Sequence, residues 1–248
     1  MVQLKSDIEI DKIRMSCNLL SNLFEELKKI ITEGISTIDI DTFVRSICKK
    51  LGAKPAFLDY DGFPAAICTS PNDIVIHGIP NNKKLKNGDI LSLDCGLNYE
   101  GYFSDAAFTV PIGKISAENQ KLLQVTQECL DLAIKNAVFG NRISDISNAV
   151  YNHAKQNGFG IVREYCGHGV GFSQHEDPQI PNYISTGPNP RLRAGMVLAI
   201  EPMINAGTGA IKEGADNWTV FTKDGKCSAH FEHTIAIFPD HTEVLTKW

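Results

Sequence analysis

The chain has 248 residues, of which 43% are hydrophobic and 21% charged, and its formal net charge is −5. This composition is typical of a soluble globular protein, and its mild acidity disfavours nucleic acid as a partner because phosphate binding needs a concentrated basic surface. Seven widely spaced cysteines without a C-x-x-C indicate reduced thiols in a cytoplasmic protein and no cysteine zinc site. No stretch is typical of a signal peptide or a membrane span, so we expect no membrane contact.

The first part of the chain has the pattern of two helices followed by short strands. Ser6 and Glu9 have the spacing of a capping box, and apolar residues then recur every three or four positions as far as Gly34. Gly52 ends a second helix, and from Ile90 onward apolar residues alternate with polar ones, as in a strand. The predicted elements are helices at 6–34 and 36–51 and strands at 66–69, 74–76, 90–97 and 102–110.

The same order of elements recurs after Pro111. The predicted elements there are helices at 116–138 and 144–157 and strands at 159–166, 195–203, 217–222 and 230–238. Because two helices followed by antiparallel strands occur twice, we interpret the chain as an α+β fold with internal pseudo-symmetry. No linker or change of composition separates the halves, so we expect one domain over 1–248 and no N-terminal extension domain.

Two aspartates flank the turn signal at residues 98–101. A turn centred between Tyr99 and Glu100 would place Asp94 directly opposite Asp105, so that the two carboxylates converge on one face of the hairpin. Like charges at that distance repel each other unless a cation lies between them. The alternative is that both aspartates lie on a solvated outer face.

Three further polar residues interrupt apolar or glycine-rich stretches. Glu201 and Glu232 each lie within an otherwise apolar strand, and three glycines surround His168 in Cys166–Gly171, which lets backbone or ligand approach its ring. Each alone has an ordinary explanation, as a surface position, a salt bridge or a structural histidine. Taken together with the two aspartates, they form a ligand set suited to two adjacent divalent ions bridged by water or hydroxide.

In order and type, these five residues resemble the dinuclear metal site of the methionine aminopeptidases, which are pita-bread metallopeptidases. The resemblance extends from the first helix to about Phe238. It rests on the segments Val75–Pro80, Leu93–Gly96, Ser104–Ala106, Cys166–Gly171, His175–Pro178, Ile200–Met203, Asn217–Val220 and Phe231–Thr234.

The resemblance implies a pita-bread fold, with two pseudo-twofold αα-ββ halves, an antiparallel sheet and helices on its outer face. It also implies that Asp105 and Glu232 bridge two metal ions, that Asp94 binds one of them, and that His168 and Glu201 bind the other. The implied activity is removal of an N-terminal methionine from nascent proteins and peptides whose second residue is small, by a metal-activated bridging water. An oxygen-rich set with one imidazole accepts cobalt, manganese or iron, and also zinc.

The resemblance further assigns residues to the substrate. His77 would lie near the scissile amide, His175 near its carbonyl oxygen, and Glu201 would act as the proton shuttle. The methionine pocket would be formed by Tyr60, Phe63, Cys68, His77 and Trp218, where a thiol beside aromatic rings suits a thioether.

The chain departs from the family pattern at two positions of this pocket. Phe57 stands where relatives often carry cysteine, and Gln174 where an aromatic residue is common. We expect both to affect the shape of the pocket and the preference for the second residue. His230 and His233 receive no assigned role, although His233 is adjacent to Glu232 and is a candidate to support it.

Two alternatives stay open, a proline-specific (Xaa-Pro) peptidase of the same fold and a pita-bread domain that binds partners without catalysis. Only 32 residues separate His168 from Glu201, which favours the type I methionine aminopeptidases over the type II form with its helical insertion. The expected partners are peptide and nascent-protein N-termini, acted on by a monomer. A transient ribosome contact is compatible with this role, and Lys83, Lys84 and Lys86 predict a solvated basic loop that is a candidate for it.

Overall fold

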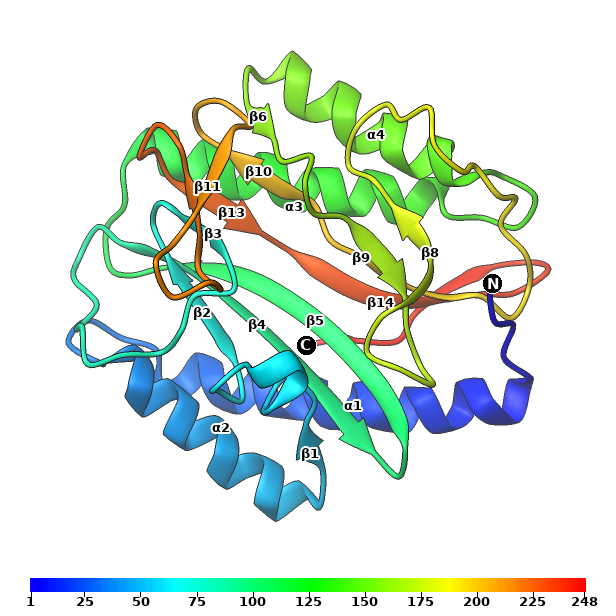
Figure 1. Ribbon diagram of the computed structural model, residues 1–248, viewed down its shortest axis with the longest axis horizontal. Coiled ribbons are helices and arrows are strands. Elements are labelled where there is room, and N and C mark those ends of the chain that lie inside the picture. Colours follow the sequence, from blue (N-terminus) through cyan, green and yellow to red (C-terminus); the bar gives the residue numbers. More distant parts are fainter.

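The computed structural model describes residues 1–248, and Figure 1 shows two pairs of helices with strands between them. The helices are α1 Asp7–Ile30, α2 Thr37–Leu51, the 3-10 turn η1 Tyr60–Gly62, α3 Ala117–Asn136 and α4 Ile143–Gln156. The strands are β1 Lys54–Pro55, β2 Cys68–Pro71, β3 Ile74–Ile76, β4 Ile90–Tyr99, β5 Tyr102–Pro111, β6 Gly160–Ile161, β7 Gly167–Gly169, β8 Glu176–Ile180, β9 Val197–Ile200, β10 Met203–Asn205, β11 Ile211–Glu213, β12 Val220–Thr222, β13 Ser228–His230, β14 Glu232–Ile237 and β15 Thr242–Val244.

The main sheet has two halves that meet at β5 and β14. Its order is β1-β4-β5-β14-β9-β7-β8, with β2 added beside β4 and β15 beside β14, and all its pairs are antiparallel. The pairs β4–β5 and β9–β14 therefore occupy equivalent places on either side of the centre, each after its own two helices. This arrangement confirms the predicted α+β fold with pseudo-twofold halves. Two three-stranded sheets, β13-β10-β6 and β11-β12-β3, complete the structure.

Each half buries the outer face of its strands against its own helices. Leu91, Leu93 and Leu97 of β4 pack in one apolar cluster with residues of α1 and α2. Leu198 of β9 and Ile235 of β14 pack in a second cluster with residues of α3 and α4. Because side chains alternate along a strand, the opposite face is separate from these clusters. On that face Val197 and Ala199 of β9 and Ala236 of β14 pack with α1, and the polar residues lie beyond them.

The helix boundaries follow the capping signals in the sequence. The Ser6 hydroxyl accepts a hydrogen bond from the Glu9 amide, while the Glu9 carboxylate accepts one from the Ser6 amide, so the predicted capping box is present. Gly52 ends α2 in the left-handed region at φ 66°. The first helix ends at Ile30, short of the predicted end near Gly34. No helix has the length and apolar character required to cross a membrane.

The predicted register of the central hairpin is wrong. Glu100 and Gly101, with φ of 52° and 87°, form the two-residue turn, so that Tyr99 pairs with Tyr102. Positive φ at both turn residues matches the twist of the flanking strands, and this selects a turn one residue later than predicted. Asp94 therefore pairs with Ala107, and Asp105 with Gly96. A shift of two residues in the partner keeps both aspartates on one face, but diagonal to each other.

Two long strands predicted near the C-terminus are each interrupted. The segment 195–203 divides into β9 and β10 around Glu201 and Pro202, and the segment 230–238 divides into β13 and β14 at Phe231. Pro202 has no N–H to donate to a ladder, and the chain passes from the main sheet to a smaller one at these points. The predicted strand at 159–166 also covers only Gly160 and Ile161.

Candidate metal and active site

The inner face of the main sheet carries a row of carboxylates around one small residue. Ala107 of β5 pairs with Asp94 of β4 on one side and with Glu232 of β14 on the other, so these side chains point to the same face. Asp105 lies two residues before Ala107 and shares its face. The Thr234 hydroxyl donates to the Asp105 carbonyl at 2.7 Å, and the Asp105 amide donates to that hydroxyl at 3.1 Å, which ties β5 to β14 beside the row.

Glu201 faces Glu232 at the interruption between the two sheets. The pairs Ile200–His233 and Met203–His230 have the same register on either side of the break. Glu201 and Glu232 therefore lie opposite each other at the break between β9 and β10 and between β13 and β14.

His168 completes the group from β7, which pairs with β9. Its Nδ1 lies 2.9 Å from the Gly169 carbonyl, which can only accept, so Nδ1 carries the hydrogen and the lone pair is on Nε2. Nε2 lies 3.6 Å from a Glu201 oxygen and 3.8 Å from an Asp105 oxygen. Ligand atoms of Asp105, His168 and Glu232 all lie within 4.8 Å of one another.

The glycines beside His168 permit close packing of backbones. A Cβ at Gly167 would lie 2.5 Å from the Ala199 carbonyl oxygen, and one at Gly169 would lie 2.3 Å from that of Asp177. These glycines therefore let β7 lie close to the backbones of β9 and β8.

Burial strongly perturbs the proton affinity of this group. Burial and the charge of neighbouring carboxylates raise the pKa values of Asp94, Glu201 and Glu232 well above their usual range. Burial also raises the pKa of Asp105 to about 7, although hydrogen bonds from the Ala106 amide and Gln174 oppose it. Burial lowers the pKa of His168 to about 3, and the imidazole is neutral.

The group has the chemistry of a site for divalent cations. One oxygen each of Asp94, Asp105 and Glu232 is buried and accepts no hydrogen bond. A buried anion without a partner carries a penalty of several kcal/mol, which a retained proton or a cation removes. Carboxylate oxygens with one neutral imidazole suit manganese, iron, cobalt or zinc, so the residues fit the metal chemistry expected from the sequence.

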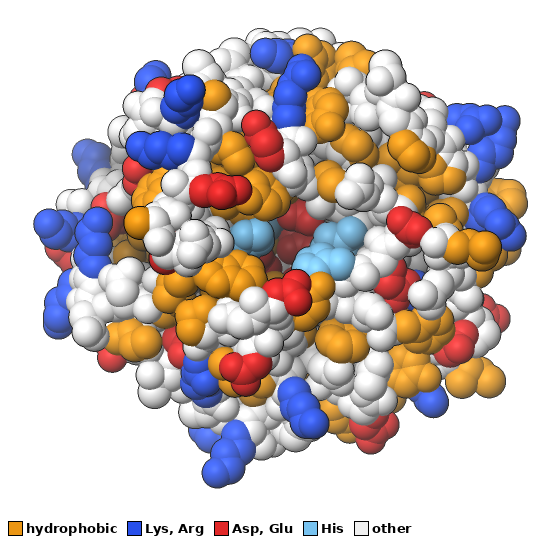
Figure 2. Space-filling view, viewed as in Figure 1, with side chains coloured by type: hydrophobic (Ala, Val, Ile, Leu, Met, Phe, Trp, Pro, Cys, Tyr) orange, Lys and Arg blue, Asp and Glu red, His pale blue; other side chains and the backbone are white.

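All eleven residues predicted for the site line one cavity of about 390 Å³. They are Tyr60, Phe63, Cys68, His77, Asp94, Asp105, His168, His175, Glu201, Trp218 and Glu232. Figure 2 shows the mouth of this cavity as a hollow with acidic side chains at its floor, histidines on either side and hydrophobic side chains beside them.

Two further histidines, His77 and His175, line the cavity beside the carboxylates. The His175 ring lies 4.5 Å from the His168 ring, centroid to centroid, and its Nδ1 is 2.9 Å from the Tyr60 hydroxyl. His77 follows β3 with φ 56° and lies edge-on to Tyr165 at 5.4 Å. Burial lowers the pKa of His77 to about 4 and also lowers that of His175.

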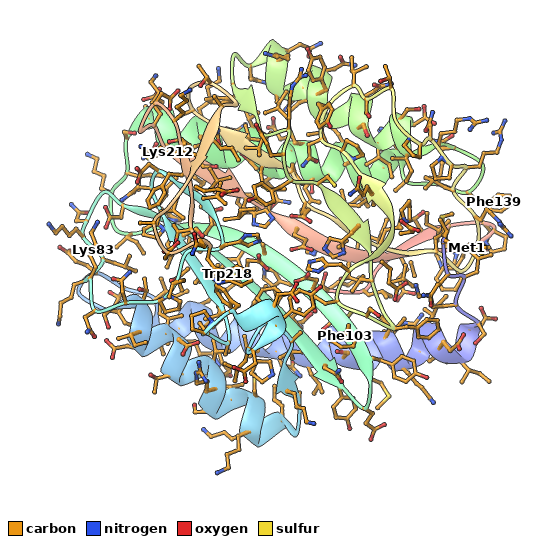
Figure 3. The ribbon with its side chains drawn as sticks, in the orientation of Figure 1. Met1, Lys83, Phe103, Phe139, Lys212 and Trp218 are labelled. Carbon is orange, nitrogen blue, oxygen red and sulfur yellow. The ribbon has the colours of Figure 1, made fainter.

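An aromatic compartment adjoins the carboxylates. Trp218, labelled in Figure 3, lies 5.1 Å from the Phe63 ring in a T-shaped contact. Cys68 belongs to the same apolar cluster and pairs with Asp94 across β2 and β4. Phe57 also lines the cavity, as expected for a residue that affects the pocket.

Two contacts of the site were not predicted from the sequence, and one side chain was predicted on the wrong face of its strand. His230 is 1% exposed, and its Nε2 lies 3.3 Å from a Glu201 oxygen. Gln174 does not line the cavity; its amide donates to Asp105. His233 was a candidate to support Glu232, but it faces the other side of β14, where it contacts Thr246. The alternation along the strand could have shown this, because neighbouring residues point to opposite faces.

The same arrangement is found in known proteins. A family model described as metallopeptidase family M24 matches residues 11–238. The chain belongs to metallopeptidase family M24. It is 48% identical to a methionine aminopeptidase of Treponema pallidum, over 100% of this chain and 97% of the relative. It is also 48% identical to methionine aminopeptidase 1 of Bacillus subtilis, over 100% of both chains.

Solved structures of the family agree with the fold. A crystal structure of methionine aminopeptidase from Thermotoga maritima superposes with a TM-score of 0.97 at 42% identity, covering 100% of both chains. A prolidase from Pyrococcus furiosus superposes with a TM-score of 0.79 at 24% identity and shares the fold, but this chain covers only 65% of it. These matches confirm the pita-bread fold and the predicted membership of the type I methionine aminopeptidases, a branch of metal-dependent hydrolases.

Proposed function

We propose that the chain removes the N-terminal methionine from peptides and nascent proteins whose second residue is small. The observation that carries the proposal is the placement of four carboxylates and one neutral imidazole in a cavity with an aromatic, thiol-containing wall. The relatives named methionine aminopeptidase, at 48% identity over the whole chain, support the substrate class.

The ligand assignment is part of this proposal. Asp105 and Glu232 would bridge two divalent ions, Asp94 would hold one ion, and His168 with Glu201 would hold the other. The unpartnered oxygens and the Nε2 lone pair of His168 support it. When bound, such ions lower the pKa of a water molecule and polarise the scissile carbonyl. Cobalt, manganese, iron and zinc all suit these donors.

The protein's own residues would orient the substrate and move the proton. Glu201 lines the cavity beside the other proposed ligands, so its carboxylate is placed to accept a proton and pass it to the leaving amine. With the Tyr60 hydroxyl donating to Nδ1 of His175, the Nε2–H of that ring is free to donate to the substrate carbonyl oxygen. His77, neutral and packed against Tyr165, would contact the scissile amide.

The methionine side chain would occupy the aromatic compartment. Phe63 and Trp218 offer ring edges and faces, and Cys68 is a small polarisable neighbour, so an unbranched thioether can contact sulfur and rings together. Tyr60 and His77 would close the compartment on the side of the carboxylates. A branched or charged first residue would lose these contacts.

We extend the proposal to the setting in which the chain works. It would act as a monomer in the cytoplasm, where its seven free cysteines stay reduced. A transient ribosome contact would use the loop of Lys83, Lys84 and Lys86, whose lysines are exposed; Lys83 projects from the margin of the molecule in Figure 3.

A peptide panel tests the activity. Met-X-Ser peptides with X from Gly to Leu are assayed beside X-Pro peptides, with added Mn²⁺ and with a chelator. Methionine release restricted to small X, and abolished by the chelator, is the expected result. Preferred cleavage of X-Pro peptides would replace the proposal with a proline-specific peptidase. If no peptide is cleaved, either with Mn²⁺ or with the chelator, the chain would be a domain that only binds partners.

Two substitutions test the ligand assignment. Asp105→Asn and Glu232→Gln remove a negative charge with little change of shape, and each should abolish methionine release while the chain stays folded by circular dichroism. Asp240→Asn is the matched control, because Asp240 is 83% exposed and bonds only to His241. Full activity in either site variant would refute the assignment.

A further inference from the structure

Gln174 makes a buried polar contact that the proposed chemistry does not use. The side chain, from the loop between β7 and β8, is 1% exposed, and its Nε2 lies 2.5 Å from Oδ2 of Asp105. The amide nitrogen faces Asp105, and a carboxylate that binds a cation is ionised and can only accept a hydrogen bond. The other amide atom, Oε1, is buried and has no partner. Asp105 therefore provides the only hydrogen bond of this carboxamide.

The carboxamide occupies a space that a glycine leaves open. Gly96 is the cross-strand partner of Asp105 on the inner face of the sheet. A Cβ at this position would lie 2.9 Å and 3.0 Å from Oε1 and Nε2 of Gln174 and 3.0 Å from the Phe57 ring. Gln174 thus lies over Gly96, beside Phe57, and donates to Asp105 without itself lining the cavity.

The loop that carries Gln174 is anchored on both sides. Oε1 of Glu176 accepts hydrogen bonds from the amides of Phe172 at 2.6 Å and Ser173 at 3.0 Å. Its second oxygen pairs with Lys5, and the side chains of this pair are 3% and 1% exposed. The donor is therefore fixed by the fold and does not depend on the mobility of a surface loop.

The two oxygens of Asp105 consequently differ. Oδ2 accepts from Gln174 and also lies 3.8 Å from Nε2 of His168, whereas Oδ1 is buried without a hydrogen-bond partner. We propose that Gln174 is a positioning residue for Asp105 and sets the affinity of the site for divalent cations. The inference rests on the proposed function, because it takes Asp105 as the ligand shared by two ions. Hydrogen bonds to ligating groups typically change metal affinity by about 10–100-fold.

Binding of Mn²⁺ to metal-stripped protein, measured by calorimetry, tests the inference. Gln174→Met keeps an unbranched side chain and removes the donor; we expect it to weaken Mn²⁺ association by about 10–100-fold. Gln127→Met is the matched control, because Gln127 donates to Asp131 at 3.0 Å on the exposed face of α3, away from the cavity. It should bind Mn²⁺ as the unmodified chain does.

Two further readouts separate positioning from general damage. The visible absorption of bound Co²⁺ should change in Gln174→Met, since it reports the geometry of the ligands, and KM for Met-Ala-Ser at saturating Mn²⁺ should stay unchanged because Gln174 does not line the cavity. Gln174→Leu repeats the test if the first variant folds poorly. Mn²⁺ affinity within threefold of the unmodified chain, or an equal loss in Gln127→Met, overturns the inference. Normal Mn²⁺ binding without methionine release by the unmodified chain would overturn the proposed function alone.

Discussion

Removal of divalent ions should make the stability of the folded chain depend steeply on pH above neutrality. The carboxyl groups of the site have raised pKa values in the folded state, that of Asp105 to about 7, so the folded chain holds protons that the unfolded chain releases near pH 4. Their stabilising contribution is complete below pH 4 and is lost as the pH rises through the folded-state values.

The buried histidines act in the opposite direction, in a lower range of pH. Burial lowers the pKa of His77 to about 4 and those of His168 and His230 to about 3, so their contribution is lost as the pH falls below about 6.5. Between pH 4 and 6.5 the two groups of residues oppose each other. Above pH 6.5 the carboxyl groups set the slope, and near pH 8.5 they are joined by the buried thiols, whose pKa values burial also raises. The metal-free chain should therefore lose stability with every further rise in pH.

The size of the effect follows from the number of protons retained. Each carboxyl group that is protonated only in the folded chain gives a slope of about 1.4 kcal/mol per pH unit. One such group over the unit from pH 7 to 8 should lower the melting temperature by about 3–6 °C for a domain of this size. Asp94, Glu201 and Glu232, whose pKa values are raised furthest, are the groups that sustain the slope above pH 7.

Calorimetric melting at pH 6.5, 7 and 8, with chelator and with Mn²⁺, measures this directly. Mn²⁺ should remove the slope, because it replaces the protons. Asp105→Asn should melt higher than the unmodified chain at pH 8 in chelator, since it removes one buried charge, and should respond less to Mn²⁺. Asp240→Asn should follow the unmodified chain. Equal melting at pH 6.5 and 8 in chelator, or a lower melting temperature for metal-free Asp105→Asn, would refute the reasoning.

Two further predictions concern parts of the fold that support the site. Lys5→Met should lower the free energy of unfolding, measured in urea, by about 3–5 kcal/mol, because it leaves the Glu176 carboxylate buried without its cation. Adding Glu176→Gln to Lys5→Met should recover part of this loss. A double variant as unstable as the sum of the two single changes would contradict the prediction. Glu100→Asn should stabilise the chain by roughly 1 kcal/mol, because Glu100 is held at φ 52° before Gly101 and asparagine tolerates that conformation better than glutamate does. An unchanged midpoint of unfolding in urea would show that the turn carries no strain.

Periodicity predicted the faces of the strands well. The alternation from Ile90 to Leu97 places Asp94 on the inner face and Leu91 and Leu93 in the core, as the structure shows. A face depends only on whether a residue number is odd or even along the strand, so it survives an error of two in the register. The partner of Asp94 depends on the turn, and the turn is decided by backbone angles at Glu100 and Gly101 that composition does not specify.

The interruption of the long strands is harder to predict from the sequence. Pro202 signals a break in a ladder, and it directly follows Glu201, so the sequence contains one of the two signals. The matching break at Phe231 has no local signal and arises because β10 and β13 continue together into a smaller sheet. The opposed carboxylates of Glu201 and Glu232 at this opening therefore depend on a pairing between distant segments.

The contacts around Asp105 could not be predicted from local sequence patterns. That a glycine faces Asp105 follows from the register, but the residue that fills the space above Gly96 comes from a loop 69 residues after Asp105. That loop is fixed by an ion pair to Lys5, 171 residues before Glu176. A local sequence pattern indicates neither contact, and for this reason the sequence alone predicts that Gln174 affects the shape of the pocket. In the folded protein it is a hydrogen-bond donor to a carboxylate of the cavity, and its effect is therefore expected on metal affinity and not on substrate binding.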